Sequence, residues 1–528
     1  MFRATAALPI ETVRPARVSG WVAVLGSGVV SLAICAYQLS LPHVLWGIHG
    51  ADDGVHLTAA LRLPYGDVPY RDFAFLDPPG LTWLMATFAG LAEPRTVLGV
   101  ARVATALVTA ANASLAALVL RSHGFVPMLL AGLMLAVCPL AVAADNTVTP
   151  EPFAVFFCLL GLIAMFPGGH LAQRKRLILA GASLGFAGSI RPLALVPAAV
   201  ALALCLPRLG DARRLLSGLV VGVALPCVPF LVLAPGSFLH DVLVLPLTKT
   251  PTGDEYASFT ERIVMTFGLG TRLSASDRSQ LAWIALLGVG LLVVEAYVVG
   301  MRRRSRLAWL VLGAAAAVLC ALVAAREFDE ADAYFAVPFT AMLVGVSVGG
   351  FNEALRRATR SDRLGDGVGR IARLGLVTFA AFALVATALS LPIATEYVRI
   401  SVGEAFDPGR AVAARIPEGA CVVFDTPGPV IAGNRFIASK RGCPPLADPF
   451  VLWLTENNGV APPAPAVAPA FTAHWRAWLK RADYALLWVP QSSYVPWTRK
   501  LKSWFDKNYE LVFGRPGTYL YRHVEKKS

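Results

Sequence analysis

Acidic side chains are concentrated in one short stretch of an otherwise apolar chain. Residues 51–80 read ADDGVHLTAALRLPYGDVPYRDFAFLDPPG and contain five aspartates, two arginines and four prolines. A carboxylate at a membrane surface can accept a proton from a hydroxyl group, or hold a divalent cation such as Mg²⁺ or Mn²⁺ against a phosphate. The adjacent Asp52 and Asp53 are the leading candidates for this chemistry, and for a metal site if the protein has one.

A structural role for the pair is the alternative, because Asp53 precedes the helix-like segment GVHLTAALRL and could cap it. The same loop continues with four further charged residues, which are more than a connector between two helices needs. These are Asp67, Arg71, Asp72 and Asp77. The stretch therefore favours a functional loop over a simple linker.

The composition identifies the elements that must position these residues as membrane helices. Of 528 residues, 56% are hydrophobic and only 15% are charged, with a mean hydropathy of +0.61, whereas soluble domains carry about 25% charge. The net charge of +13 fits arginines in cytoplasmic loops. Basic and aromatic residues are not interleaved as on a nucleic-acid surface, so nucleic acid is not an expected partner.

Eleven apolar segments have roughly the length needed to span a bilayer. They lie at about 21–41, 97–120, 125–143, 153–166, 177–190, 192–207, 215–235, 281–300, 307–325, 335–351 and 374–392. The piece Gly80–Ala92 is shorter. It could be a twelfth span, but we expect a helix lying along the membrane surface.

The distribution of charge decides between these two topologies. With eleven spans and a cytoplasmic N-terminus, the inner segments contain 20 Lys+Arg and 5 Asp+Glu, whereas the outer loops contain 8 and 17. A twelfth helix would invert every later loop and destroy this positive-inside pattern. We therefore expect a multi-pass plasma-membrane protein whose first outer loop, 43–96, carries the acidic stretch outside the cell.

The same topology places the more polar residues 393–528 outside, as a soluble α/β domain after the membrane domain 1–392. Its expected elements are strands in 419–427 and 482–490, an amphipathic helix in 471–482 and a hairpin in 509–523. Cys421 and Cys443 would lie in an oxidising compartment, where they form either a disulfide or a pair of buried thiols.

The residues of the acidic loop resemble the first outer loop of the GT-C class of membrane glycosyltransferases. The resemblance rests on an acidic pair after the first helix, a G-x-x-P-Y-x-D segment at 66–72 and an x-P-P turn at 77–79. It is closest to the branch that holds polyprenyl-phosphate-mannose protein mannosyltransferases and aminoarabinose transferases. It extends over about 20–200, with weaker similarity at 238–251 and 326–339. Asp77 departs from the pattern, because many relatives have lysine there.

This resemblance implies an enzyme that transfers a sugar from a polyprenyl-phosphate donor, with inversion, at the outer face of the lipid bilayer. Mannose is the preferred sugar and arabinose the other, and the acceptor is a cell-envelope glycan, a lipoglycan or a protein. Asp53 would be the general base with Asp52 as its partner, although the order could be reversed. The resemblance also implies that loop and wall residues orient the substrates: Arg71, Asp72, Asp77, Asp145 and Glu151.

A donor phosphate needs cationic partners near the outer boundary. Arg191 at the end of one apolar segment and Arg102 near the start of another are the leading candidates. Snorkelling toward lipid headgroups is the alternative for Arg102 and Arg191. Lys249, Arg262 and Arg326 are weaker candidates, because exposed basic residues in outer loops are usually solvated. Three scattered histidines without ligand spacing, His49, His56 and His240, are more often ordinary surface or packing residues than a metal site.

Two other functions fit a polytopic chain. A transporter or flippase of lipid-linked sugars typically has repeats and charges at the bilayer midplane, whereas this chain places its acids in loops. A non-catalytic scaffold would not need an acidic first loop. The abundance of Ala, Val and Arg is typical of a GC-rich genome, such as an actinobacterial one.

Overall fold

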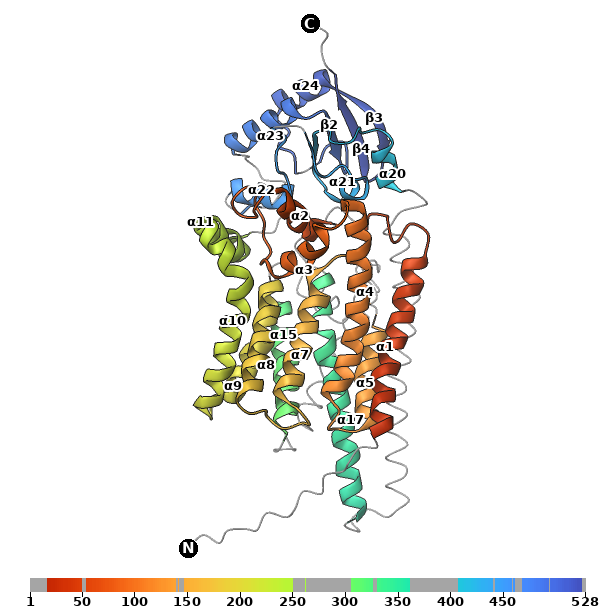
Figure 1. Ribbon diagram of the computed structural model, residues 1–528, viewed down its shortest axis with the longest axis vertical. Coiled ribbons are helices and arrows are strands. Elements are labelled where there is room, and N and C mark those ends of the chain that lie inside the picture. Colours follow the sequence, from red (N-terminus) through yellow and green to blue (C-terminus); the bar gives the residue numbers. More distant parts are fainter. Residues whose placement is uncertain are drawn as a thin grey trace.

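Figure 1 shows the computed structural model of the protein, a helical bundle with a small sheet at one end. The structure describes residues 17–49, 54–138, 141, 147–249, 262, 305–325, 330–360, 407–439, 442–457, 459–460, 468–492 and 494–524. The expected spans at 281–300 and 374–392, and most of the proline-rich segment 461–470, lie outside these residues. The number of eleven spans and the domain boundary at 392 therefore remain predictions.

The bundle is made of long apolar helices and shorter ones packed between them. In the described part of the chain, five helical stretches are long and apolar enough to cross a membrane. They belong to α1 (Arg17–Ser40), α4 (Pro94–Val119), α10 (Leu209–Leu233), α15 (Arg306–Ala324) and the run from α16 (Glu330–Tyr334) into α17 (Val337–Arg360). The shorter bundle helices are α5 (Phe125–Ala136), α7 (Pro150–Met165), α8 (Lys175–Ile190) and α9 (Leu195–Cys205).

Glycines allow α8 and α10 to pack with their backbones in contact. A Cβ on Gly181 or Gly185 would lie 2.0 or 2.1 Å from the carbonyl oxygen of Leu215 or Leu219 in α10. Gly218 and Gly222 meet the backbone of α8 at the same separations. Small residues on facing helices are the usual way in which membrane helices approach closely, so the position of the end of α8 follows from this contact.

One end of the bundle carries the short elements of the polar loops. α2 (Val55–Arg62), η1 (Leu63–Tyr65) and α3 (Gly80–Ala89) come from the first loop, and α11 (Pro235–Leu239), η3 (His240–Val244) and α12 (Leu245–Thr248) follow α10. η2 (Pro192–Ala194) separates α8 from α9. With ten residues, α3 is about 15 Å long, shorter than a bilayer, but α5 and α9, which were expected to span, are nearly as short. The position of α3 along the membrane surface therefore stays a prediction.

The C-terminal part contains a four-stranded sheet in the order β1-β2-β4-β3. β1 (Val422–Phe424) is parallel to β2 (Tyr484–Leu487), and β3 (Tyr509–Arg515) and β4 (Thr518–His523) form a hairpin antiparallel to β2. The helices around it are α20 (Pro408–Ala413), α21 (Gly428–Ala432), α22 (Pro449–Glu456), α23 (Pro469–Arg481) and α24 (Arg499–Asn508). The expected strands, hairpin and amphipathic helix are therefore confirmed.

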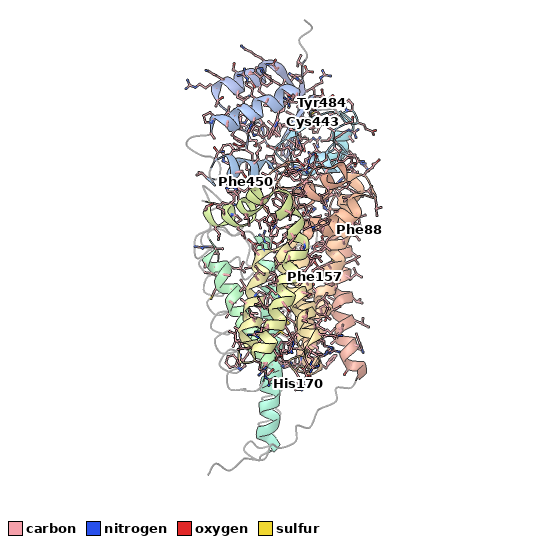
Figure 2. All side chains as sticks on the ribbon, turned by 60° about the vertical axis from the view of Figure 1, so that its left-hand side comes forward. Phe88, Phe157, His170, Cys443, Phe450 and Tyr484 are labelled. Atoms are coloured by element: carbon pink, nitrogen blue, oxygen red, sulfur yellow. A yellow bond between two sulfur atoms is a disulfide. The ribbon has the colours of Figure 1, made fainter. Side chains whose placement is uncertain are left out.

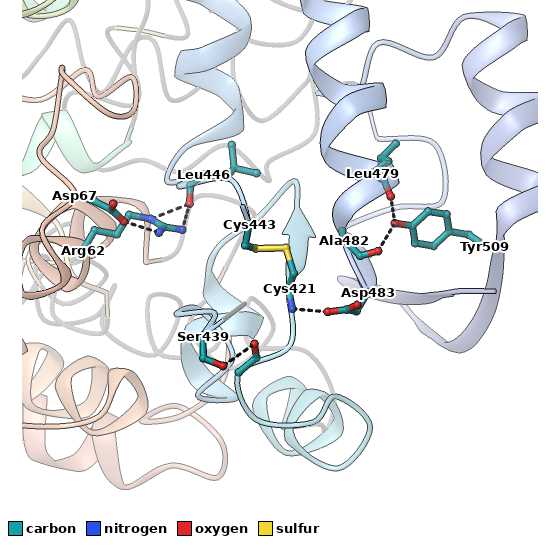
Figure 3. Close-up of a disulfide and its surroundings, with 11 residues drawn as sticks. Arg62, Asp67, Cys421, Ser439, Cys443, Leu446, Leu479, Ala482, Asp483 and Tyr509 are labelled. Atoms are coloured by element: carbon teal, nitrogen blue, oxygen red, sulfur yellow. Dashed lines mark hydrogen bonds and ion pairs between the residues drawn. A yellow bond between two sulfur atoms is a disulfide. The ribbon is translucent and has the colours of Figure 1, made fainter. Parts of the chain in front are cut away.

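The sheet and the acidic loop lie at the same end of the molecule. Cys443 and Tyr484 lie at this end and His170 at the other (Figure 2), which matches the opposite sides assigned to these segments by charge. Cys421 and Cys443 form a disulfide (Figure 3), so the first of the two states expected for this pair is the one present.

Candidate active site

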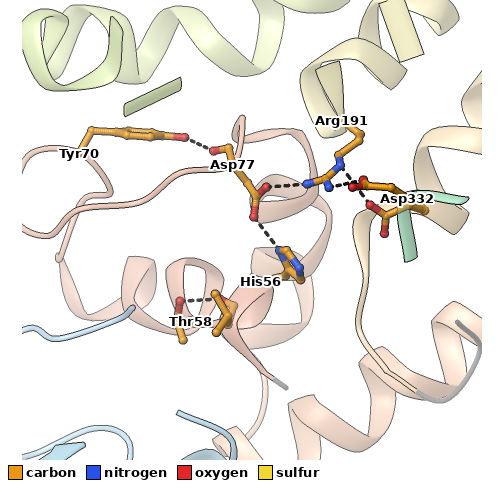
Figure 4. Close-up of polar contacts among 8 residues, drawn as sticks. His56, Thr58, Tyr70, Asp77, Arg191 and Asp332 are labelled. Carbon is orange, nitrogen blue, oxygen red and sulfur yellow. Dashed lines mark hydrogen bonds and ion pairs between the residues drawn. The ribbon is translucent and has the colours of Figure 1, made fainter. Parts of the chain in front are cut away.

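Arg191 is the centre of a cluster of charged side chains at the end of α8. Its Nε lies 3.1 Å from Oε1 of Glu151, its Nη1 lies 3.4 Å from Oδ1 of Asp77, and its Nη2 donates to Asp332 (Figure 4). The three carboxylates come from the first turn of α7, the loop before α3 and α16. One guanidinium therefore joins three segments that are far apart in the sequence.

His56 in α2 adds a second cation to this cluster. Its Nδ1 lies 2.6 Å from Oδ2 of Asp77. Burial lowers the pKa of His56, but the charge and hydrogen bond of Asp77 raise it by more than burial lowers it, so that the pKa is about 9. Burial also raises the pKa of Asp77, but His56 and then Arg191 hold it below its ordinary value. At neutral pH a charged imidazolium and a carboxylate therefore face each other.

The backbone of Asp77 is held by an aromatic residue of the same loop. The hydroxyl group of Tyr70 donates to the carbonyl oxygen of Asp77 at 2.5 Å. The Tyr70 ring makes edge contacts with Phe75, Phe230 and Phe238 at centroid distances of 6.0, 5.7 and 5.0 Å. Tyr70 has a φ of 68°, a conformation that costs energy in a bulky residue and here directs the ring into this pocket.

Below the cluster, buried polar groups join three helices. Nδ2 of Asn112 in α4 donates to the carbonyl of Pro152 in α7 at 2.8 Å and to the hydroxyl of Tyr334 in α16 at 3.0 Å.

Glu151 is 1% exposed, and its Oε2 has no hydrogen-bond partner among the described residues. A buried carboxylate oxygen of this kind is a ready acceptor for a ligand hydroxyl group.

The other expected site residues lie in different surroundings. Arg71 and Asp72 form an ion pair with each other at 2.7 Å, and the Arg71 side chain is 46% exposed. Arg102 is fully buried, and its Nη1 donates to the carbonyls of Val44 and Leu45 after α1. Arg102 therefore holds the start of the first loop against α4 and does not snorkel toward the headgroups.

Four expected site residues lie outside the described residues: Asp52, Asp53, Asp145 and Arg326. The N-cap of α2 is Gly54, so the capping position that was the alternative for Asp53 belongs to the glycine. Covalent geometry keeps the Cα of Asp53 within about 11 Å of the Cα of His56, three residues later. The placement of the acidic pair at the active site therefore stays a prediction.

A metal site can be assessed only for part of the chain. Within the described ranges, no group of three or more His, Cys, Asp or Glu side chains is arranged to hold a metal ion. Asp52 and Asp53, the residues expected to bind a cation if one is used, lie outside those ranges.

Sequence reasoning overlooked two members of the cluster, His56 and Asp332. From the sequence, His56 was weighed only as a metal ligand or an ordinary surface or packing residue, whereas in the structure it is the ion-pair partner of Asp77. One signal was present: an aspartate at a position where GT-C relatives have lysine requires a cation from elsewhere. Asp332 lies in a segment, 326–339, whose resemblance to the class was weak.

Comparison with known proteins supports the fold. No family model matches the chain, and no curated protein matches it. Crystal structures of ArnT from Cupriavidus metallidurans, in the apo state and bound to undecaprenyl phosphate, match with TM-scores of 0.59 and 0.58 at 15% identity, over 96% of this chain and 99% of theirs.

The archaeal oligosaccharyltransferase AglB from Archaeoglobus fulgidus, in complex with an inhibitory peptide and a dolichol-phosphate, matches with a TM-score of 0.57 at 13% identity. That match covers 96% of this chain and 74% of AglB. The chain has the fold of GT-C glycosyltransferases. The resemblance found in the acidic loop is thereby confirmed as a similarity of fold, and the GT-C branch, sugar and acceptor are matters for proposal.

Proposed function

We propose that this protein transfers a sugar from a polyprenyl-phosphate donor to an acceptor of the cell envelope at the outer membrane face. The observation that carries the proposal is the partly buried cluster around Arg191, which the loops form at one end of the bundle. The fold supports it, because the similar ArnT structure is bound to undecaprenyl phosphate.

In this proposal Arg191 and His56 bind the donor phosphate. A guanidinium offers paired N–H donors that match phosphate oxygens, and a protonated imidazole adds one more. Both cations are paired with carboxylates in this structure. An incoming phosphate therefore replaces some of these carboxylates as their partner, above all Asp77, which contacts both cations. Arg102 and Arg326 are further candidates for this role.

The acidic pair performs the chemistry. Asp53, with Asp52 as its partner, takes the proton from the acceptor hydroxyl group, whose oxygen attacks the anomeric carbon as the bond to the phosphate breaks. Attack from the opposite face inverts the anomeric configuration. Glu151 accepts a hydrogen bond from the sugar through Oε2, and Asp145, Arg71, Asp72 and Asp77 orient the substrates or their binding groups.

A divalent cation, Mg²⁺ or Mn²⁺, is an optional addition at Asp52 and Asp53, which would hold it against the phosphate. Chelation tests this addition: lost transfer that returns with the metal supports it, and undiminished transfer removes it. For the donor sugar we prefer mannose to arabinose, and for the acceptor a glycan, a lipoglycan or a protein.

Transfer from synthetic polyprenyl-phosphate mannose and polyprenyl-phosphate arabinose tests the function directly. The purified wild type is compared with Asp52→Asn and Asp53→Asn. The control is Asp506→Asn, because Asp506 is an exposed residue of α24 that pairs with Lys502, far from the cluster in the sequence. We expect the base variant to lose about 100- to 10,000-fold in rate. Full transfer by both loop variants contradicts the catalytic assignment, and movement of lipid-linked sugar across vesicles without transfer identifies a flippase.

A further inference from the structure

α2, the helix that follows the acidic pair, is held at both ends by the C-terminal part of the chain. At its N-cap, a Cβ built on Gly54 would lie 3.1 Å from Cδ1 of Ile431 and 3.5 Å from Cα of Gly428. At its last residue, Nε and Nη2 of Arg62 donate to the carbonyl oxygen of Leu446 at 3.1 and 2.6 Å. Residues 428–446 thus contact both ends of one eight-residue helix.

Arg62 is built into this contact as a buried cation. It is 7% exposed, its Nη1 lies 3.1 Å from Asp67, and its Cζ lies 4.6 Å from the centre of the Phe436 ring. Burial lowers the pKa of Arg62 to about 10, and Asp67 opposes this effect, so the guanidinium is charged at neutral pH. Two N–H groups on one carbonyl fix the angle between α2 and residue 446 as well as their distance.

The carbonyl that receives Arg62 lies three residues after a disulfide. Leu446 follows Cys443 by three residues, and Cys443 is bonded to Cys421 at the start of β1 (Figure 3). The backbone N–H of Cys421 donates to Asp483 at 2.9 Å, and its carbonyl accepts the N–H groups of Asp483 and Tyr484 before β2 and at its start. A continuous path therefore leads from the sheet to α2: hydrogen bonds from β2 to Cys421, the disulfide to Cys443, the backbone to Leu446 and the hydrogen bonds from Arg62.

A second set of contacts joins the C-terminal part to the bundle without touching α2. Arg95 in α4 pairs with Asp407 at 3.0 Å and donates to the carbonyl of Ala432 at 2.8 Å, and Asn434 donates to Glu93. These contacts hold the C-terminal part on the bundle. The Arg62 contact is therefore one of several between the two parts, and it is the one that α2 makes through its last residue.

We propose that Arg62 is a positioning residue: through the carbonyl of Leu446, three residues from the disulfide, it fixes α2 and with it His56. This inference rests on the proposed function for its effect on catalysis. The C-terminal part then acts on the rate of the reaction through α2, in addition to any contact that it makes with an acceptor.

Kinetics give the first test. For Arg62→Gln we expect kcat to fall roughly 10- to 100-fold, since small displacements of reacting groups cost this much, with less than a threefold change in the donor KM. Arg62→Lys keeps the charge but offers a single donor nitrogen in place of the two that contact Leu446, so we expect it to recover part of the rate. The control Arg522→Gln, which removes an exposed ion pair in the hairpin, leaves kcat unchanged.

A double-variant comparison tests the path through the disulfide. Cys421→Ser with Cys443→Ser lowers kcat in the same direction, and adding Arg62→Gln brings no further loss, because both changes act on the same contact. Losses that multiply, or a disulfide-free protein with the wild-type kcat, overturn the proposed path.

Hydrogen exchange gives a readout that does not depend on activity. We expect faster exchange of the α2 amides, 55–62, in Arg62→Gln and in the disulfide-free protein, with α4 and α24 unchanged. Unchanged α2 exchange in both overturns the inference, even if the wild type transfers no sugar and the proposed function fails. If Arg62→Gln does not fold, Arg62→Lys and the disulfide-free protein decide by the same measurement.

Discussion

Arg191 illustrates what one side chain type can do that no other can. Its three carboxylate partners are reached by three different nitrogen atoms, Nε, Nη1 and Nη2. A planar guanidinium offers donors in several directions at once, whereas an ammonium group is a single point of charge on a flexible stem. The buried carboxylate of Glu151 depends on this geometry, because leaving a buried charge unpaired is costly.

Arg191→Lys should therefore be a damaging change although it keeps the charge. We expect it to lower the free energy of unfolding by about 3 kcal/mol, the usual result of breaking a buried ion pair, and to raise the donor KM. Thermal unfolding in detergent and steady-state kinetics measure the two effects. A lysine variant with the wild-type values of both would show that the three-way contact is dispensable.

The pair of His56 and Asp77 predicts how stability depends on pH. The pKa of His56 is raised from 6.5 to about 9, so its stabilisation is complete below pH 6.5 and is lost as the pH rises through 9. The pKa of Asp77 is lowered from 3.8, so its contribution is lost only in acid. We expect the melting temperature of the wild type to fall between pH 7 and 9.5 by more than that of His56→Gln. Parallel curves would contradict the assigned pair.

For single residues, the sequence predicted which side chains belong to the site better than it predicted which of them are in contact. Asp77, Glu151 and Arg191 were expected site residues, and the structure brings them together. His56 and Asp332 were not, because their role depends on contacts across 21 and 141 residues. Residue type and spacing report local chemistry, whereas the folding of distant loops decides which of many charges converge.

Among the elements, the contact between α8 and α10 has the most direct bearing on the site. Four glycines let the two backbones touch, and Arg191 follows α8 immediately. Any side chain larger than hydrogen at these positions separates the helices. Because the guanidinium lies at the end of α8, the separation would displace it from its carboxylates.

Gly185→Val tests this coupling of packing to function. A Cβ at Gly185 would lie 2.1 Å from the carbonyl oxygen of Leu219, so we expect a loss of about 1 to 3 kcal/mol in the free energy of unfolding and a lower transfer rate. Gly26→Ala in α1 is the matched control, since no atom lies within 4 Å of a Cβ there. Equal melting temperatures for the two variants would contradict the prediction.

The sequence predicted the type of each helix and strand more accurately than its first and last residues. The expected span 215–235 is α10, Leu209–Leu233, and the expected span 335–351 continues in α17 to Arg360. Hydropathy detects only the apolar part of a helix, whereas alanine and arginine extend it readily into polar sequence. The order of the strands depends on long-range pairing and has no local signal.

For the molecule as a whole, the division of charge predicted which loops share an end. The acidic first loop, the start of α7 and α16 meet at Arg191, and the sheet lies above them. The charge pattern could predict which loops share an end because successive loops of a membrane bundle alternate between its two sides. The order and number of the helices alone decide this. Which end faces the outside of the cell is the part that remains to be measured.

Cysteine labelling in intact cells measures that orientation. Arg476 in α23 and Gln173 before α8 are exposed residues in segments that we assign to opposite sides. We expect a membrane-impermeant maleimide to label Arg476→Cys in intact cells and Gln173→Cys only after permeabilisation, each relative to the wild type. The reverse pattern would place the acidic loop in the cytoplasm and contradict the proposed reaction site.

The contact between Arg62 and Leu446 spans 384 residues, and this separation has a consequence during synthesis. A ribosome that adds about 5 to 20 residues per second needs roughly 20 to 80 seconds to cover that distance. For this time the nascent chain carries a complete first loop whose α2 lacks its partner. A product released before residue 446 never acquires that partner, so translation through residue 446 decides whether Arg62 can hold α2.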